Sequence, residues 1–442
     1  MPSLFTVPIE PKFVACEFVF EKMKVFTSAK SPLMVVCKNK DPGGDQLKVM
    51  FKNGDDLRQD ILTLQMIDIM DRIWLDNDLD LAMTPYKVMG TDCMQGYLEF
   101  NLNSVTLAFI QHKDCESLLH TFKDSAVMDF FVKTVIGQVG GEKDEWRQFQ
   151  KFERIEPIKD RAEKELDHNA QDFMKEFNKR LKRIRDVFIR SCAGYCVASY
   201  VLGLGDRHPD NIMINTKEGN FFHIDFGHFL ECKKLMPVIK LSREPDPFVF
   251  TPEVAYFVNG QSFKDTKKEN KKKEKKKKQK EAENARGGAA AAGHAQTSGS
   301  QPKDGEDEDE EEEQGGGVEY TTLNIEKNAT DDFRVFQDKC CRAYNLLRHN
   351  SNKILNLFLI MLSAGMPELQ KKDEIRKLEK KLNLKSSDRE AEKIFIREIK
   401  EAMTTFTRRM DNMAHNYKQI RIKEKAEKIK QRARAASQAA AE

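Results

Sequence analysis

The sequence predicts an α+β protein with two lobes, the first rich in strands and the second mostly helical. Two observations support this class. Between residues 10 and 104, short runs alternate apolar and polar residues, which is typical of half-buried strands. From residue 172 onward, the longest apolar patterns instead repeat at helical spacing. A strand-rich block followed by a helix-rich block favours two packed units with a cleft between them.

Residues 10–104 are the predicted N-terminal lobe, with several strands and one helix. The strand-like runs read CEFVFEKMKVF, LMVVC, LKVMF and GYLEF. The helix is expected after the turn NGDD, where Asp55 or Asp56 can serve as the N-cap. Four apolar residues then share one face of this helix: Leu62, Met66, Ile69 and Ile73.

The predicted C-terminal lobe consists of two segments, residues 105–260 and 331–417. The first segment holds the helix RIRDVFIRSCAGYCVASYVLGL, then a hairpin and an irregular loop. The second segment is helical, and its most apolar helix is expected to end near the Gly365–Pro367 break.

Three charged segments are not expected to belong to either core. Residues 142–171 lack clear periodicity and are expected to form a loop insertion or a solvated helix. Residues 261–330 are low in complexity, with a lysine block and an acidic block, and they predict disorder because little apolar surface offsets chain entropy. The alternatives are an electrostatic arm for anionic lipid or a pair of oppositely charged blocks that dock on each other. Residues 418–442 form a basic tail, either a solvated helix or one that meets an anionic membrane surface.

Composition excludes several classes of protein. The 442 residues are 33% charged, yet the formal net charge is only +3, which argues against general nucleic-acid binding. The cysteines are scattered without a C-x-x-C pair, and no signal peptide is visible, so we expect free thiols and a cytoplasmic location. The longest apolar run, Ile354 to Leu362, is far shorter than the roughly 18 residues that cross a bilayer.

Two polar residues flank the predicted hairpin in a pattern that favours a metal. The segment NIMINTKEGNFFHID reads as strand, turn and strand, so Asn211 enters the first strand and Asp225 follows the second. Both side chains are therefore expected at the same end of the hairpin. Mg²⁺ prefers one or two protein oxygens plus substrate phosphates, so this pair favours Mg-ATP over a fully protein-bound metal.

Asp206 extends this pattern to phosphoryl transfer. It precedes Asn211 by five positions, as in the Asp-x-x-x-x-Asn catalytic loop of protein kinases, and DFG at 225–227 matches their metal-binding triplet. The catalytic loop reads DRH at 206–208, however, which reverses the usual order, and no glycine-rich phosphate motif lies near the N-terminal strands. Arg207 is expected to be structural and to pair with a buried carboxylate. The sequence is therefore not that of an ordinary protein kinase.

Long stretches resemble the catalytic domain of phosphoinositide 3-kinases, in the phosphatidylinositol 3-/4-kinase superfamily. They include GDRHPDNIM, HIDFGHFL, MFKNGDDLRQDILTLQMIDIMDRIWLDNDLDL and RSCAGYCVASYVLGLGDRH. FTSAKSPL resembles the family's phosphate loop, and PFVFTPEVAYFVNG and YNLLRHNSNKILNLFLIMLSAGMPELQ resemble its C-terminal lobe. The likeness runs from about Phe13 to Met413 and implies a bilobal protein-kinase-like fold. The family's ubiquitin-like, C2 and helical domains are not recognisable before it, so we expect a kinase domain alone.

The resemblance implies an ATP site between the lobes. Ser28 in the phosphate loop would contact the phosphates, although its neighbourhood also fits a plain turn between strands. Lys52 would reach the phosphates, with Asp60 on the following helix and Tyr86 lining the inner pocket. YLEF would be the hinge, and adenine would meet the Glu99 carbonyl and the Asn101 amide between the side chains of Leu98 and Met213.

The same likeness implies Asp206, His208 and His228 as catalytic residues and Asn211 and Asp225 as metal ligands. A sugar hydroxyl is a poor nucleophile, so a base must accept its proton while metal and cations stabilise the phosphoryl charge. Histidine has a reference pKa of about 6.5 and needs no large shift, whereas Asp206 needs only positioning. The sequence leaves the identity of the base open.

The loop ECKKLMPVIKLSREPD is expected to select the substrate. Each head-group phosphate needs cationic donors, and the loop offers Lys233, Lys234, Lys240 and Arg243. These clusters suggest a phosphorylated inositol lipid, although such lysines can also simply solvate a loop. The loop partly resembles class III, PFVFTPEVAYFVNG resembles class II, and the histidine after DFG favours class I. The class therefore stays open.

We therefore predict a lipid kinase that uses Mg-ATP to phosphorylate the 3-hydroxyl of the inositol ring of phosphatidylinositol or its phosphorylated forms. The alternatives are a phosphoinositide 4-kinase or Ser/Thr kinase of the same superfamily, or a catalytically inactive membrane-binding scaffold. The expected partners are the phosphoinositide lipid and a membrane surface that recruits the protein peripherally, with a regulatory subunit as an option.

Overall fold

The structure is a computed structural model of the chain. It describes residues 4–27, 30–100, 103–113, 124–139, 168–230, 248–263, 325–366 and 368–404. The chain divides into two compact units, a larger one up to Gly260 and from Thr330 onward, and a smaller one over Gln261–Ala329. The smaller unit contains the short helix α8 (Ile325–Asn328), and the larger unit carries every element described below.

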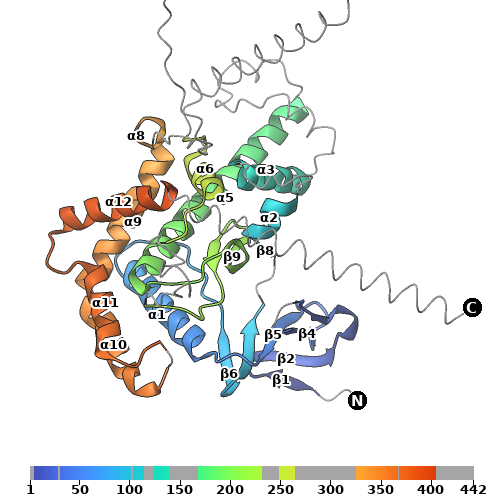
Figure 1. Cartoon of the computed structure of the whole chain (residues 1–442). Coiled ribbons are helices and arrows are strands. Elements are labelled where there is room, and N and C mark those ends of the chain that lie inside the picture. Colours follow the sequence, from blue (N-terminus) through green and yellow to red (C-terminus); the bar gives the residue numbers. More distant parts are fainter. Residues whose placement is uncertain are drawn as a thin grey trace, which may run out of the picture. The chain divides into compact units, whose positions relative to one another are not determined.

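The N-terminal lobe is built on one curled antiparallel sheet (Figure 1). Its strands are β1 (Phe5–Val7), β2 (Glu10–Phe18), β3 (Lys24–Val25), β4 (Leu33–Asn39), β5 (Leu47–Asn53), β6 (Val88–Asp92) and β7 (Gln95–Glu99). The order is β1-β2-β4-β5-β7-β6, with β3 also pairing with β4. The run CEFVFEKMKVF is not one strand, because β2 ends at Phe18 and a single 3₁₀ turn, Phe20–Lys22, separates it from β3.

Helix α1 (Arg58–Leu75) follows β5 and packs deeply into the fold. Its N-cap position is Leu57, so the predicted Asp55 or Asp56 cap is wrong by one residue or more. Asp56 still contributes there, because its Oδ1 accepts the Arg58 backbone N–H at 3.1 Å. At the other end, the buried Trp74 indole donates to the Ala343 carbonyl in the C-terminal lobe at 3.0 Å.

Asp71 on α1 gives a test of how burial affects stability. Burial, together with Asp80 and Asp68, raises its pKa to about 6. The folded state therefore favours the neutral carboxyl, and ionisation destabilises the protein as pH rises from about 4 towards 7. Since Asp71 is partly exposed, we expect Asp71→Asn to raise the free energy of unfolding at neutral pH by about 1 kcal/mol.

Urea denaturation at neutral pH and near pH 4 measures this effect. We expect it to shrink strongly at the lower pH, because the Asp71 carboxyl is then protonated in the folded state and partly protonated in the unfolded state. Asp172→Asn is the matched control, because Asp172 is exposed and does not contribute to the raised pKa of Asp71. A less stable Asp71→Asn protein at neutral pH would contradict the prediction.

The C-terminal lobe is helical around the long helix α5 (His168–Leu202), which starts well before the predicted helix (Figure 1). The other helices are α2 (Leu107–Lys113), α3 (Ala126–Val139), α6 (Pro252–Asn259), α9 (Asp331–His349), α10 (Ser351–Met361), α11 (Lys372–Leu382) and α12 (Asp388–Thr404). Helix α5 contacts α3, α6, α9 and α11. The predicted break after the apolar helix is confirmed, because α10 ends at Met361 and a 3₁₀ turn, Leu362–Ala364, leads to Gly365 in the left-handed conformation.

A second small sheet lies in the C-terminal lobe. It consists of β8 (Ser104–Thr106), β9 (Ile212–Asn215) and β10 (Phe221–His223), in the order β10-β9-β8. The pairs β10·β9 and β8·β9 are both antiparallel. The predicted hairpin over β9 and β10 is therefore confirmed, whereas β8 was not foreseen. The α+β fold with a strand-rich and a helical lobe is confirmed as well.

Arg348 joins the C-terminal helices. It lies on α9, and its guanidinium donates to the carbonyls of Leu382, Asn383 and Ser386 and to the Asp388 carboxylate. The Arg348 side chain is only 5% exposed. These bonds hold the connection between α11 and α12 against α9.

All cysteines that the structure describes are free thiols, as expected. Among the described residues, no helix combines the length and apolar character that a membrane span requires. Of the three charged segments, the structure does not describe most of residues 142–171 and 261–330 or any of the tail 418–442.

Candidate functional site

The β9–β10 hairpin brings the predicted metal ligands to one end. His223 pairs with Ile212 across the hairpin, and the Ile224 N–H donates to the Asn211 carbonyl at 3.0 Å. The backbones of Asn211, just before β9, and Asp225, just after β10, therefore lie at the same end of the hairpin. The Asn211 side-chain amide donates to the Asp206 carbonyl at 2.9 Å, which fixes the catalytic loop against the hairpin.

Both key aspartates adopt a left-handed backbone. Asp206 has φ = 57° and Asp225 has φ = 62°. For a residue other than glycine this conformation costs about 1–3 kcal/mol, and such strain gathers at functional sites because the surrounding bonds must enforce it. At Asp206 the carbonyl accepts the Asn211 amide, and at Asp225 the backbone is held by Tyr86 and Arg207.

Lys52 reaches this end of the hairpin from the N-terminal lobe. It lies on β5 opposite Gly96 of β7, and its Nζ is 3.6 Å from Asp225 Oδ1. The Lys52 side chain is 13% exposed, whereas that of Asp225 is 51% exposed. A Cβ on Gly96 would lie 2.2 Å from the Met89 carbonyl oxygen, so the close pairing of β6 with β7 at this position requires glycine. Lysine and aspartate therefore meet where the two lobes face each other.

The side chains of Asp60 and Tyr86 accept hydrogen bonds from the backbone of the DFG triplet. Asp60 Oδ1 accepts the Phe226 N–H at 2.9 Å, and the Tyr86 hydroxyl accepts the Asp225 N–H at 3.2 Å. Burial raises the pKa of Asp60 to about 6, while Phe226 and Lys52 act in the opposite direction. Burial, followed by the charge of Asp60, raises the pKa of Tyr86 far above its ordinary value, so the phenol stays neutral.

Arg207 ties together parts of the backbone, in line with the structural role expected from the sequence, and its pairing with a buried carboxylate stays a prediction. The side chain is buried and donates to the carbonyls of Gly205, Ile224 and Asp225. It therefore ties the start of the predicted catalytic loop to the DFG triplet. These three backbone acceptors help to hold the buried guanidinium in place.

Three residues of this region were not foreseen from the sequence. Gln59 on α1 donates its amide to the Gly227 carbonyl at 3.0 Å. Glu368, between α10 and α11, contacts the His228 ring at 2.5 Å, and Lys377 donates to the Leu230 carbonyl at 3.2 Å. Each partner lies more than a hundred residues away in the chain. Periodicity and local motifs therefore carried no signal for them.

The remaining predicted residues divide into two groups. Leu98 is buried on β7, Glu99 ends that strand, and Met213 lies on β9. His208 lies in the catalytic loop, and its carbonyl accepts the Asn211 N–H at 2.8 Å. The following predicted residues lie outside the described part of the chain: Ser28, Asn101, Lys233, Lys234, Lys240 and Arg243.

The donor set at the hairpin end fits a cation that is shared with phosphates. Because the Asn211 nitrogen donates to a carbonyl, its oxygen is the atom that can bind a cation. Asp225 adds a half-exposed carboxylate. Over the described ranges, no three His, Cys, Asp or Glu side chains gather into a metal-binding group. A cation here would therefore take further ligands from phosphates and water, as Mg²⁺ does.

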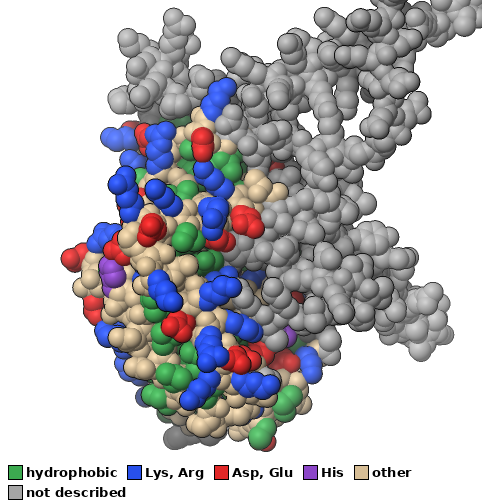
Figure 2. Space-filling view, turned by 60° about the vertical axis from the view of Figure 1, so that its left-hand side comes forward, with side chains coloured by type: hydrophobic (Ala, Val, Ile, Leu, Met, Phe, Trp, Pro, Cys, Tyr) green, Lys and Arg blue, Asp and Glu red, His purple; other side chains and the backbone are tan. Residues whose placement is uncertain are grey.

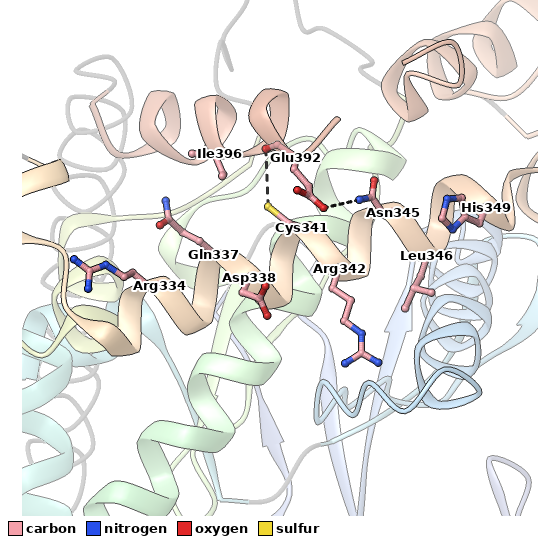
Figure 3. A pocket seen from close by; sticks show the side chains of 10 residues that line it. All are labelled: Arg334, Gln337, Asp338, Cys341, Arg342, Asn345, Leu346, His349, Glu392 and Ile396. Atoms are coloured by element: carbon pink, nitrogen blue, oxygen red, sulfur yellow. Dashed lines mark hydrogen bonds between the residues drawn. The ribbon is translucent and has the colours of Figure 1, made fainter. Parts of the chain in front are cut away.

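A cavity of about 580 Å³ lies elsewhere in the C-terminal lobe (Figure 3). It runs along one face of α9, from Arg334 to His349, and is closed on one side by Glu392 and Ile396 of α12. Its lining mixes both charges. Figure 2 likewise shows Lys, Arg, acidic and apolar side chains interspersed over one face of the protein. Neither view isolates a patch of one charge that would identify a ligand.

Comparison with protein families identifies the chain. The sequence model described as phosphatidylinositol 3- and 4-kinase matches residues 46–276, more than half of the chain. The chain belongs to the phosphatidylinositol 3- and 4-kinase family. The matched range starts just before β5 and includes Lys52, the catalytic loop and the DFG triplet of this kinase-family chain.

Curated relatives of this phosphatidylinositol kinase family member carry related names. Phosphatidylinositol 3-kinase 1 of Dictyostelium discoideum is 33% identical over 94% of this chain and 19% of its own length. Phosphatidylinositol 4-phosphate 3-kinase C2 domain-containing subunit alpha of Pongo abelii is 31% identical over 94% of this chain and 18% of its own length. The chain therefore spans about a fifth of the length of the curated relatives it matches.

Proposed function

We propose that this protein is a lipid kinase that transfers the γ-phosphate of ATP to the 3-hydroxyl of the inositol ring of phosphatidylinositol or its phosphorylated forms. The observation that carries the proposal is the meeting of Lys52 with Asp225 beside the hairpin that also presents Asn211. Kinases need these three functions together, a lysine for the phosphates and two oxygen ligands for the metal. The names of the relatives, which are 3-kinases, support the 3-hydroxyl.

In the proposed reaction, the inositol hydroxyl oxygen bonds to the γ-phosphorus as the bond from that phosphorus to the β–γ bridging oxygen breaks. The bond electrons leave with ADP, and the hydroxyl proton passes to a base. Asp206, His208 and His228 are the candidate catalytic residues for this step. Lys52 neutralises charge on the phosphates, and Asp206 is held for the reaction by the strained loop described above.

Kinase-family membership implies ATP and a divalent cation, and we propose Mg²⁺ with Asn211 and Asp225 as its ligands. The metal would draw charge from the phosphates and hold them in line with the hydroxyl. Ser28, Leu98, Glu99, Asn101 and Met213 are proposed to surround the nucleotide. Leu98 and Met213 come from the two lobes, which is consistent with a nucleotide held between them.

The direct test is incubation of the chain with Mg-ATP and each of three lipids in vesicles: phosphatidylinositol, its 4-phosphate and its 4,5-bisphosphate. Separation of the product isomers then shows which hydroxyl was phosphorylated. We expect 3-phosphorylated products. Phosphate on the 4-hydroxyl would favour the 4-kinase alternative, phosphorylation of protein serine alone would favour the Ser/Thr kinase, and nucleotide-independent vesicle binding without product would favour the inactive scaffold.

The lipid head group is proposed to contact the cationic residues of the loop after DFG. Replacing Lys233, Lys234, Lys240 and Arg243 by alanine removes the donors that phosphate groups need. We expect loss of phosphorylation of the phosphorylated lipids, with the dissociation constant for Mg-ATP unchanged, as measured by a fluorescent nucleotide. Replacing Lys38, Lys371, Lys372 and Lys380, which are exposed elsewhere, is the charge-matched control. Equal loss in both variants would mean that only overall charge matters.

We propose that the protein acts in the cytoplasm and is recruited peripherally to membranes, because its lipid substrate lies in a bilayer. The basic tail, residues 418–442, is the proposed contact with anionic lipid, at about 1 kcal/mol for each well-placed cation. A regulatory subunit is a further proposed partner. Sedimentation with anionic and with neutral vesicles separates the electrostatic contribution from binding to the substrate.

A further inference from the structure

One carboxylate of the C-terminal lobe holds the two residues that follow the DFG triplet. Glu368 Oε1 lies 2.5 Å from His228 Nδ1, and Glu368 Oε2 accepts the Phe229 backbone N–H at 2.7 Å. The Glu368 side chain is 9% exposed, whereas the His228 ring is 28% exposed. The ring therefore has one edge against a nearly buried carboxylate while part of it stays accessible from solvent.

The segment that carries Glu368 is itself fixed. Its neighbours Met366 and Leu369 are fully buried and form a β-bridge with each other across the turn. A second C-terminal residue, Lys377 on α11, donates to the Leu230 carbonyl at 3.2 Å. Leu230 also has a left-handed backbone, with φ = 54°. The start of the loop after DFG is thus bound to α11 and the turn before it through consecutive residues.

The chemistry of the pair determines which ring nitrogen of His228 carries a proton. An ionised carboxylate can only accept hydrogen bonds, so Nδ1 must be the donor at 2.5 Å. In a neutral imidazole the second nitrogen, Nε2, is then the basic one. If Nε2 takes up a proton, the carboxylate also stabilises the resulting positive ring. A neighbouring acceptor that fixes tautomer and orientation is the usual way in which a histidine is prepared for proton transfer.

We propose that Glu368 is a positioning residue that holds His228 in its Nδ1–H tautomer and sets the angle of the ring. The catalytic consequence rests on the proposed lipid kinase function. There, the inositol hydroxyl would give its proton to His228 Nε2 as its oxygen bonds to the γ-phosphorus and ADP leaves. The Nδ1 proton stays in its bond to Glu368, and the new charge on the ring is paired with the carboxylate.

The first test needs no enzymatic activity. The full chain is labelled with ¹⁵N-histidine, and the His228 ring signals are assigned by comparison with His228→Asn. At alkaline pH we expect a protonated Nδ1 and an unprotonated Nε2 in the wild-type protein. The reverse tautomer in the wild type overturns the inference. Glu368→Met, which removes the acceptor at similar length, should lose the Nδ1–H preference, whereas Lys377→Met should keep it, because Lys377 binds only the backbone at Leu230.

The second test is a double-mutant cycle on lipid phosphorylation. Glu368→Gln keeps the side-chain shape but lowers the acceptor strength, and we expect kcat to fall between about tenfold and a hundredfold. The KM for Mg-ATP should stay unchanged, because the nucleotide is held elsewhere. In the His228→Asn background the same change should lower kcat no further, because Glu368 acts through that ring. Glu379→Gln on the exposed side of α11 is the control.

Independent losses that multiply in the double variant would overturn the inference, because they would show that Glu368 acts only by anchoring Phe229. An inactive wild-type chain would instead contradict the proposed lipid kinase function. The isotope-labelled ring still decides the positioning role in that case, so the two failures can be told apart.

Discussion

Replacing Asp225 by asparagine is expected to lower kcat for lipid phosphorylation about a thousandfold, because the carboxylate that we propose as a metal ligand would supply several kcal/mol of transition-state stabilisation. Asparagine keeps the size of the side chain but removes the charge that faces Lys52 at 3.6 Å. The backbone bonds that hold residue 225 come from Tyr86 and Arg207 and do not need the carboxylate. The Asp225→Asn protein should therefore fold normally but lose catalytic activity.

Turnover with saturating lipid and a range of Mg²⁺ concentrations measures this effect. We expect Mg-ATP binding to weaken and its dependence on Mg²⁺ to become shallower. Glu218→Gln is the matched control, because Glu218 lies in the turn at the opposite end of the same hairpin and pairs only at the surface, with Arg183 at 3.0 Å. Wild-type turnover in Asp225→Asn would exclude the proposed metal site.

Replacing Arg348 by methionine is expected to lower the free energy of unfolding by about 3 kcal/mol or more, a large share of the total stability of a domain. Methionine fills similar space, but it leaves the carbonyls of Leu382, Asn383 and Ser386 without their donor. Each buried acceptor that loses its partner costs about 1–3 kcal/mol. Lysine at this position should recover only part of the loss, because it lacks the planar fork.

Urea denaturation followed by circular dichroism measures the change. Arg342→Met is the matched control on the same helix, since Arg342 is exposed and donates to the Asn77 carbonyl at the surface. We expect Arg342→Met to lower the free energy of unfolding by less than about 1 kcal/mol. An Arg348→Met protein as stable as the wild type would mean that water replaces the guanidinium without cost.

The parts of the site that the sequence predicts are those whose geometry is local. Asn211 and Asp225 flank two short strands joined by a tight turn, so their convergence follows from the hairpin alone. Lys52 could be placed on a strand by alternation, and its place near the phosphates was expected by resemblance to the family, whereas its contact with Asp225 came only from the structure. The fold class followed in the same way from strand-like and helix-like periodicity.

The parts that were missed depend on long-range packing or on very short elements. Strand β8 has three residues, too few for alternation to be visible. Glu368 and Gln59 find their partners only after two lobes and several helices have assembled. The helix cap was misplaced because Asp56 acts from one position further upstream, through the Arg58 N–H, while Leu57 occupies the cap itself.

The bonds of α1 have a mechanical consequence. Although this helix follows β5 in the chain, Trp74 fastens one end to Ala343, and Gln59 and Asp60 fasten the other end to Gly227 and Phe226. If the two lobes move relative to each other, α1 should therefore move with the helical lobe. The short link before α1, which includes Gly54 with φ = 89°, would then be one of the segments that change conformation. Nucleotide exchange would accordingly involve the sheet tilting over a stationary helix.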